Sequence, residues 1–320
     1  MSTTILLIAQ DRAADLRFSL PAAMAQPDAE VVVIDNASTD DTPALVEQHG
    51  ARHLRLERRV SWAAANNAGI AEATTGDAVL LLNADCFLEP GFLAAARPRL
   101  DEPGVGMVAP KLIRTTGGSP SDHLDAIDCV GMVVDRRRKN NLAGHGRPSL
   151  SYDRPGPCFG PDGAAALYRR DMLADCAVGG PPLDEDFEKW AADVDLAWRA
   201  QILGWGCVYE PEAVAYHVRS YSPSTRAGMP ERDRRVQFRN RYLMMVKNDT
   251  LQDVQRDVQR IAAYELAALG YGVVRERHLL AGYRDVLRLL PAARGKRRLI
   301  QERRSERGFP RAPFGLELQP

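Results

Sequence analysis

The apolar run Ala78–Leu82, which stops abruptly at Asn83-Ala84-Asp85, constrains the fold of this 320-residue chain more than any other segment. A continuous aliphatic run predicts a strand buried on both faces, as in a parallel sheet covered by helices. Residues at the carboxyl ends of such strands line the crevice where ligands bind. A carboxylate placed there is a candidate ligand for a divalent cation that grips a diphosphate. The alternative is that Asp85 only caps the next turn or helix.

Two earlier apolar runs show the same pattern. Thr4–Ala9 ends at Gln10-Asp11-Arg12, and Val31–Ile34 ends at Asp35 and a polar cluster. Helical patterns over 14–25 and 42–49 separate these runs, so we expect βαβ units, a parallel sheet and three polar strand ends on one edge. Asp35 can there accept hydrogen bonds from a base or ribose. No Gly-x-Gly-x-x-Gly follows these strands, which disfavours a dinucleotide fold of the usual fingerprint.

Composition predicts an ordinary globular protein, with 45% hydrophobic and 26% charged residues. No run approaches the roughly 20 apolar residues of a membrane helix, and the N-terminus lacks the pattern of a signal peptide. Five scattered cysteines fit neither a disulfide framework nor a zinc site, so we expect a reduced cytosolic protein. Residues 231–320 contain 20 Lys/Arg against 11 Asp/Glu, a charge of +9 that balances −9 in the rest of the chain. This asymmetry predicts a basic appendage on an acidic body.

A cluster of Ser, Pro and Gly at 221–229 predicts a boundary before that appendage. Beyond it, helical patterns cover 232–247, 251–269 and 273–290, with Pro291 closing the last. The basic tail 294–307 is interpreted either as a solvated terminus or as a patch drawn to anionic lipid. Region 115–161, rich in Gly, Pro and Ser, is expected to be a long loop, functional or disordered. Basic residues without interleaved aromatic residues or a binding motif argue against nucleic acid.

A helix is expected over 187–203, and its apolar face would contain Trp190, Val194, Ala197 and Trp198. Asp193 and Asp195 lie about 200° apart around such a helix, so they cannot both face one site. Arg199 at i+4 can pair with Asp195, which leaves Asp193 for proton transfer. The alternative for Asp193 is a first-turn acid favoured by the helix dipole. Farther along, His217 ends an apolar stretch, and neutral imidazole suits a Mn²⁺-like ion beside one carboxylate.

Seven segments follow one another in a fixed order: Val33–Asp40, Ala63–Ile70, Leu81–Asp85, Gly163–Arg170, Asp193–Arg199, Pro211–His217 and Arg239–Asn248. Together they resemble the family 2 inverting glycosyltransferases, in particular the bacterial, rhamnosyltransferase-like branch. The resemblance spans about residues 4–248 and implies a GT-A fold, an α/β fold with a Rossmann-like, mostly parallel sheet and flanking helices. It implies a catalytic domain over 1–228, with a nucleotide-sugar half (about 1–114) and an acceptor half (about 115–228). Residues 229–320 would form a helical, basic C-terminal extension.

The resemblance also implies roles for single residues. Asp85 and His217 would hold Mg²⁺ or Mn²⁺ on the diphosphate, and Asp193 would be the general base. The donor-binding residues would be Ala9, Asp11, Asp35, Asn67, Asn83 and Ala84. The acceptor side would include Gly163, Ala164 and Trp190. An inverting displacement needs a base on the acceptor hydroxyl and a Lewis acid on the leaving diphosphate, and no protein nucleophile.

The expected reaction moves a sugar from a UDP- or dTDP-sugar, with rhamnose as one candidate, to a hydroxyl acceptor. That acceptor is a glycan, a lipid-linked or a small molecule in the synthesis of cell-surface polysaccharide, glycolipid or another glycoconjugate. We expect a cytoplasmic protein. Two further possibilities stay open: a homo-oligomer, and peripheral attachment to the inner face of the plasma membrane through the basic C-terminal region.

Ala192 stands where the family usually has Glu, which keeps a second class open: a catalytically weakened GT-A protein that binds a nucleotide sugar or a partner enzyme. The presence of Asp85, Asp193 and His217 favours the active enzyme. A sugar-1-phosphate nucleotidyltransferase would need a Gly-rich phosphate loop after the first strand, and Ala9–Leu16 contains none.

Overall fold

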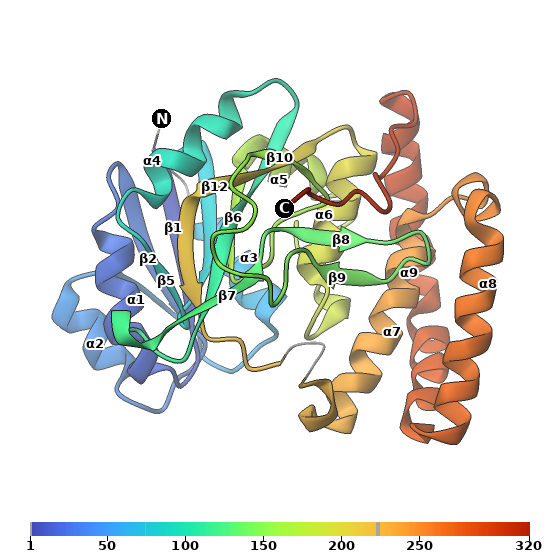
Figure 1. Cartoon of the computed structure of the whole chain (residues 1–320), viewed down its shortest axis with the longest axis horizontal. Coiled ribbons are helices and arrows are strands. Elements are labelled where there is room, and N and C mark those ends of the chain that lie inside the picture. Colours follow the sequence, from blue (N-terminus) through green and yellow to red (C-terminus); the bar gives the residue numbers. More distant parts are fainter. Residues whose placement is uncertain (1, 74, 222–224) are drawn as a thin grey trace.

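A single mixed sheet forms the centre of the computed structural model, which describes residues 2–73, 75–221 and 225–320 (Figure 1). The strands are β1 (Thr3–Ala9), β2 (Ala29–Asp35), β3 (Arg52–Arg55), β4 (Ala78–Asn83), β5 (Cys86–Leu88), β6 (Val105–Thr115), β7 (His123–Cys129), β8 (Met132–Val134), β9 (Asn140–Leu142), β10 (Gly156–Cys158), β11 (Ala165–Arg169) and β12 (Gly206–His217). The order in the sheet is β10-β12-β6-β11-β4-β1-β2-β3, with β5 paired to β12 and β7 to β6; β8 and β9 form a separate hairpin.

Helices cover both faces of the sheet and continue into a C-terminal helical layer (Figure 1). They are α1 (Ala13–Met24), α2 (Thr42–His49), α3 (Trp62–Glu72), α4 (Phe92–Ala96), α5 (Arg170–Cys176), α6 (Ala192–Ile202), α7 (Glu231–Asn248), α8 (Leu251–Val274) and α9 (Leu280–Glu306). The predicted α/β class with a C-terminal helical extension is confirmed. None of the helices in the described ranges is both long and apolar enough to cross a membrane.

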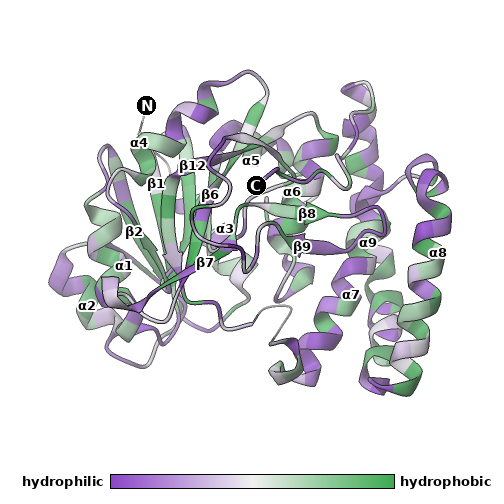
Figure 2. Cartoon of the chain, in the orientation of Figure 1, coloured by the Kyte–Doolittle hydropathy of each residue, from purple (hydrophilic) through white to green (hydrophobic). Residues whose placement is uncertain are grey.

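The strands predicted to be buried on both faces are so. Every residue of Ala78–Leu82 is at most 1% exposed, and the strands are green in Figure 2. Alternate residues of β1 face two different cores: Leu6 packs in the core that contains residues of α3, α5 and α6, whereas Leu7 packs in the core that contains residues of α1, α2 and α4. Two covered faces explain why these strands read as continuous rather than alternating apolar runs.

The predicted common edge of the sheet is also confirmed. β1 pairs in parallel with β2 and β4, and the register sets Ala9 beside Asp35 and Ile8 beside Asn83. β12 is parallel to β6 and antiparallel to β5, and this pairing sets His217 beside Cys86, the residue after Asp85. Distant segments of the chain therefore end at one place.

Three sequence predictions are corrected by the structure. Region 115–161 is not one long loop, since it contains β7, β8, β9 and β10. The helix expected over 187–203 begins only at Ala192, because Glu188, Trp190 and Ala191 have positive φ angles of 56°, 68° and 65°. Trp190 therefore lies outside the helix and not on its apolar face.

The last correction concerns the C-terminal region. Pro291 does not close a helix but lies inside α9, which runs to Glu306. The tail 294–307 is thus helical, and many of its cations are paired: Lys296 with Asp184 and Asp186, and Arg303 with Asp175. The boundary predicted at 221–229 falls partly outside the described residues, and the proposed division into domains stays a prediction.

Candidate active site

Asp85 and His217 face each other at the carboxyl edge of the sheet. His217 Nε2 lies 3.6 Å from Asp85 Oδ1, and Arg12 Nη2 lies 3.6 Å from Asp85 Oδ2. On its other side, His217 Nδ1 is 2.8 Å from Asp128 Oδ2. A carboxylate behind a histidine fixes the ring and directs its second nitrogen outward, as is usual for metal-binding histidines.

The charges of this pair depend on each other. Burial disfavours the cationic form of His217, but hydrogen bonds to Asp128 and Asp85 outweigh this effect and raise its pKa to about 9. Burial likewise opposes ionisation of Asp85, yet the hydrogen bond and charge of His217 hold the pKa of that carboxyl below its usual value. A cation bound between them would replace the imidazole proton, so binding would strengthen as pH rises.

The pair fits a divalent cation as two of its ligands. Mg²⁺ commonly takes one or two protein carboxylates and completes its shell with water and substrate phosphates. A site of three or more His, Cys, Asp or Glu ligands is absent from the described part of the chain. A cation at this pair would therefore take its remaining ligands from water or from a bound phosphate group.

Asp193 lies in the first turn of α6, and its carboxylate is held by backbone groups. The Gly163 N–H donates to Oδ2 (3.0 Å) and the Val194 N–H donates to Oδ1 (2.9 Å). Burial, followed by the charge of Asp162, raises the pKa of Asp193 to about 6 against the effect of these hydrogen bonds. A carboxylate with this pKa is mostly ionised at neutral pH yet basic enough to accept a proton in a reaction.

A partly buried arginine connects the two halves of the site. Arg219 Nε is 2.7 Å from Asp128 Oδ1, and its Nη2 donates to Asp162 Oδ2 at 2.7 Å. Asp128 holds His217, whereas Asp162 directly precedes Gly163, the residue bonded to Asp193. A chain of charged side chains therefore runs from Asp85 through His217, Asp128 and Arg219 to Asp162, next to the Asp193 site.

Sequence reasoning missed Asp128, Asp162 and Arg219. The one available signal was the spacing His217-Val218-Arg219, because alternate residues of an extended segment point to the same side. Asp128 and Asp162 lay in or beside the region expected to be a loop.

Gly163 occupies a position that leaves little room for a side chain. A Cβ there would lie 3.0 Å from the Trp62 ring and 3.1 Å from Asp193 Oδ2. The Trp62 Nε1–H donates to Asn83 Oδ1 (2.9 Å), and the Asn83 N–H donates to the Ala164 carbonyl (2.9 Å). These contacts bring Asn83, Gly163, Ala164 and Asp193 close together, and the roles assigned to them stay predictions.

Four other residues assigned to donor binding lie at the sheet edge: Ala9, Asp11, Asp35 and Ala84. The Asn36 N–H donates to the Ala9 carbonyl, and the Ala84 N–H donates to the Ile8 carbonyl. Asp35 is fully buried; it accepts from the Ser38 N–H at 2.7 Å and lies 3.3 Å from Arg55. Asp11 accepts from the Thr39 N–H at 2.8 Å and pairs with Arg59.

Two predicted site residues have other surroundings. The Asn67 amide donates to the Leu183 carbonyl (2.8 Å) and to Glu185 (3.0 Å), so it ties α3 to the segment that precedes α6. Trp190 lies in the turn before α6, with its ring 6.2 Å from that of Tyr221. Its indole N–H is buried and has no partner among the described residues.

Helix α7 holds that turn in place. Asn240 Nδ2 lies 2.9 Å from the carbonyl oxygens of Phe187, Lys189 and Trp190. Arg239 adds an ion pair to Glu188 at 2.7 Å. The C-terminal layer thus fixes the positive-φ segment from which α6, and with it Asp193, begins.

The second carboxylate of α6 points into this helical layer, and the helical angle predicts only that it does not share a site with Asp193. Asp195 is fully buried and contacts Arg199 (2.7 Å), Lys247 (2.8 Å) and Asn248 (2.9 Å). Its expected pairing with Arg199 is confirmed, but the pair is buried and shared with α7. Asp193 and Asp195 therefore have separate surroundings.

Comparison with known sequences gives one family. The family described as "Glycosyl transferase family 2" matches residues 4–176. The chain is 30% identical over 209 residues to "Uncharacterized protein y4gI" of Sinorhizobium fredii, a match that covers 60% of this chain and 21% of that protein. It is 36% identical over 100 residues to a TPR repeat-containing protein of Synechococcus elongatus, covering 31% of this chain and 24% of that protein. The chain thus matches only about a fifth to a quarter of these relatives.

Solved structures show the same fold. Residues 1–349 of S. aureus TarS in complex with UDP-GlcNAc align with a TM-score of 0.58 at 16% identity, covering 96% of this chain and 91% of that chain. A structure of GalNAc-T7 with UDP, GalNAc and Mn²⁺ aligns with a TM-score of 0.59 at 13% identity, covering 77% and 48%. The expected glycosyltransferase fold is confirmed by these likenesses, which at such identities concern the fold alone.

Proposed function

The chain belongs to glycosyl transferase family 2, and on this premise we propose that it transfers a sugar from a nucleoside-diphosphate donor to a hydroxyl acceptor with inversion. One observation carries the proposal. Asp193 is held by the Gly163 N–H with its pKa raised to about 6, and a charged network connects its surroundings to the Asp85–His217 pair. The proposal assigns Asp193 as the base for the acceptor and the Asp85–His217 pair as the place of the diphosphate.

The proposed reaction is a single displacement. Asp193 accepts the proton of the acceptor hydroxyl while that oxygen forms a bond to the sugar C1. The bond between C1 and the diphosphate oxygen breaks on the opposite face, and the diphosphate leaves with the electron pair. The Trp62 ring beside Gly163 and the unpaired Trp190 N–H are the groups we propose to orient the acceptor.

Asp85 and His217 are the proposed ligands of a divalent cation, Mg²⁺ or Mn²⁺. When bound, the cation would neutralise charge on the leaving diphosphate. Arg12, 3.6 Å from Asp85, contributes a fixed positive charge at the same place. Asp128 keeps the His217 ring oriented, with Nε2 toward Asp85.

We propose UDP or dTDP as the nucleotide, with rhamnose as one candidate sugar. The names of the TarS and GalNAc-T7 structures, which contain UDP or UDP-GlcNAc, support a uridine nucleotide. The proposed acceptor is a glycan, a lipid-linked or a small molecule in glycoconjugate synthesis. Five buried free thiols support a reducing compartment, and the cytoplasm is the proposed location.

Ala192 favours a second candidate, a GT-A protein that binds a nucleotide sugar without efficient transfer. It occupies the first position of α6 and is 5% exposed, so no carboxylate stands directly before Asp193. Donor binding without turnover would be the sign of this function.

The test combines donor binding with product stereochemistry. Wild type and Asp193→Asn are incubated with UDP- and dTDP-sugars and Mn²⁺ or Mg²⁺. ¹H NMR then identifies the anomer of the sugar that is first transferred to water or to an added acceptor. We expect the inverted anomer from wild type only, with equal donor binding by both. A retained anomer, or no binding of any nucleotide sugar, would refute the proposal, and binding without turnover would select the second candidate.

A further inference from the structure

Helix α8, at the outer edge of the C-terminal layer (Figure 1), exposes a row of apolar side chains. At 100° per residue its members fall within an arc of about 80°. This apolar stripe consists of Leu251, Val258, Ala262, Leu266, Leu269 and Val273. Leu251 and Leu266 are 70% and 73% exposed, and α8 carries green turns in Figure 2. The polar Gln255 also lies within this arc, and an exposed apolar row of this kind is typical of an interaction site.

The carboxylates of α8 all have partners on the protein side. Asp257 contacts Arg136 and Arg138 at 2.7 and 2.8 Å. Glu265, which borders the stripe, is bonded to Arg241 at 2.6 Å, and Asp253 is bonded to an arginine of α9. The exposed surface of α8 therefore offers apolar groups, glutamines and arginines, and no unpaired carboxylate.

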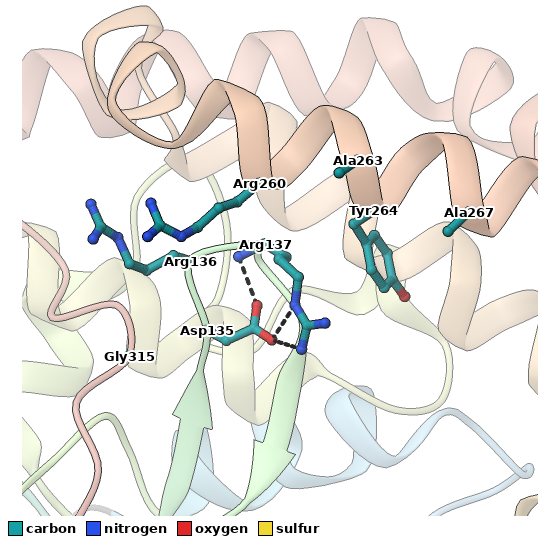
Figure 3. A pocket seen from close by; sticks show the side chains of 8 residues that line it. All are labelled: Asp135, Arg136, Arg137, Arg260, Ala263, Tyr264, Ala267 and Gly315. Carbon is teal, nitrogen blue, oxygen red and sulfur yellow. Dashed lines mark hydrogen bonds and ion pairs between the residues drawn. The ribbon is translucent and has the colours of Figure 1, made fainter.

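A basic edge lies about 80–120° around the helix from the near edge of the stripe at Leu266. It consists of Arg256 and Arg260, both exposed and without an ion-pair partner among the described residues. Figure 3 shows Arg260 beside Arg136 at a groove of about 590 Å³ between α8 and the β8–β9 hairpin. In that groove Arg137 is turned to Asp135, so the unpaired positive charge comes from Arg260.

These charges decide between the occupants of the stripe. A second copy of α8 would cover the apolar groups but would bring arginines and no free carboxylate to the basic edge. An anionic bilayer supplies both an apolar boundary and phosphate groups. We propose that α8 docks on the surface of an anionic membrane, with the apolar stripe at the headgroup–acyl boundary and Arg256 and Arg260 against lipid phosphates.

This proposal goes beyond the proposed function and does not depend on it. It also replaces the tail 294–307 as the membrane-binding element, because the structure engages many cations of that tail in ion pairs. Docking through α8 would hold the whole chain at a lipid surface through its C-terminal layer.

Vesicle sedimentation of the full chain tests the proposal. Vesicles of phosphatidylcholine alone are compared with vesicles that contain one quarter phosphatidylglycerol. We expect binding to the anionic vesicles, weakened about tenfold or more by Leu266→Glu combined with Leu269→Glu. Arg256→Gln with Arg260→Gln should weaken binding to anionic vesicles and leave the weak binding to neutral vesicles unchanged.

Leu150→Glu is the matched control, because Leu150 is a leucine 88% exposed on a loop outside α8. Its vesicle binding should equal that of wild type, and melting temperatures should stay equal in all variants because the changed side chains are exposed. Equal binding by wild type and the double glutamate variant would overturn the proposal. A dimer in solution that the double variant abolishes, without vesicle binding by wild type, would assign the stripe to a second copy instead.

Discussion

Replacing Asp195 by Asn should destabilise the protein without removing its catalytic base. The carboxylate is fully buried and contacts Arg199, Lys247 and Asn248 at 2.7–2.9 Å. If the Asp195–Arg199 ion pair were exposed, its loss would lower the free energy of unfolding by well under 1 kcal/mol. Breaking a buried ion pair from one side costs about 3–5 kcal/mol, because it leaves a buried charge uncompensated.

The expected cost lies near the lower end of that range, about 3 kcal/mol. Asp184 still contacts Lys247 and compensates part of the remaining charge. An unfolding entropy of about 2.1 cal/mol/K per residue gives about 0.7 kcal/mol/K for a chain of this length. The melting temperature should therefore fall by about 4–5 °C.

The assay compares thermal unfolding by circular dichroism with turnover per folded molecule at a temperature below both transitions. Asp193→Asn is the matched control, since it makes the same chemical change two residues away. It should melt at or above the wild-type temperature, because the pKa of Asp193 is raised by burial and its charge is therefore unfavourable in the folded state. A melting temperature of Asp195→Asn within 1 °C of wild type, or an inactive Asp195→Asn beside an active Asp193→Asn, would refute the reasoning.

Three further changes test the site. Asp193→Asn should lower turnover by about 10²–10⁴-fold. In wild type, activity should fall as pH drops through about 6, because protonation of Asp193 removes the base. Asp162→Asn should move this fall in activity to lower pH, and an unchanged pH profile would contradict the role of the Asp162 charge. UDP or dTDP should raise the melting temperature more with Mn²⁺ or Mg²⁺ than with a chelator, and Asp85→Ala should abolish this difference. Equal melting-temperature shifts with metal and with chelator, in wild type and variant alike, would argue against a cation at Asp85. Asn240→Ala should cost about 1–3 kcal/mol in urea unfolding, since it strands buried carbonyl groups, and should lower kcat more than donor affinity; wild-type kcat would show that the turn before α6 does not need this clamp.

The amino-acid sequence by itself determined the layered part of the fold. Ala78–Leu82 and Val31–Ile34 are apolar at every position because both faces of a central parallel strand are covered, so period and length identified them. The same local rule located Asp35 and Asp85 at strand ends. The angle between Asp193 and Asp195 followed from helical geometry alone.

Other features were decided only by tertiary structure. Pro291 is accommodated within α9, against its usual role as a helix terminator. The turn at Trp190 depends on Asn240, about fifty residues later, which bonds its backbone.

The charge network of the site has the same origin. Asp128, Asp162 and Arg219 become partners only when β7, β12 and the segment before β11 meet at one edge of the sheet. The local sequence predicts hydrophobic period and helical phase, because both depend only on residues that are near neighbours in the chain. Partners for a buried charge come from wherever the chain returns, so the tertiary structure alone determines the pKa of Asp193 and the depth at which Asp195 is buried.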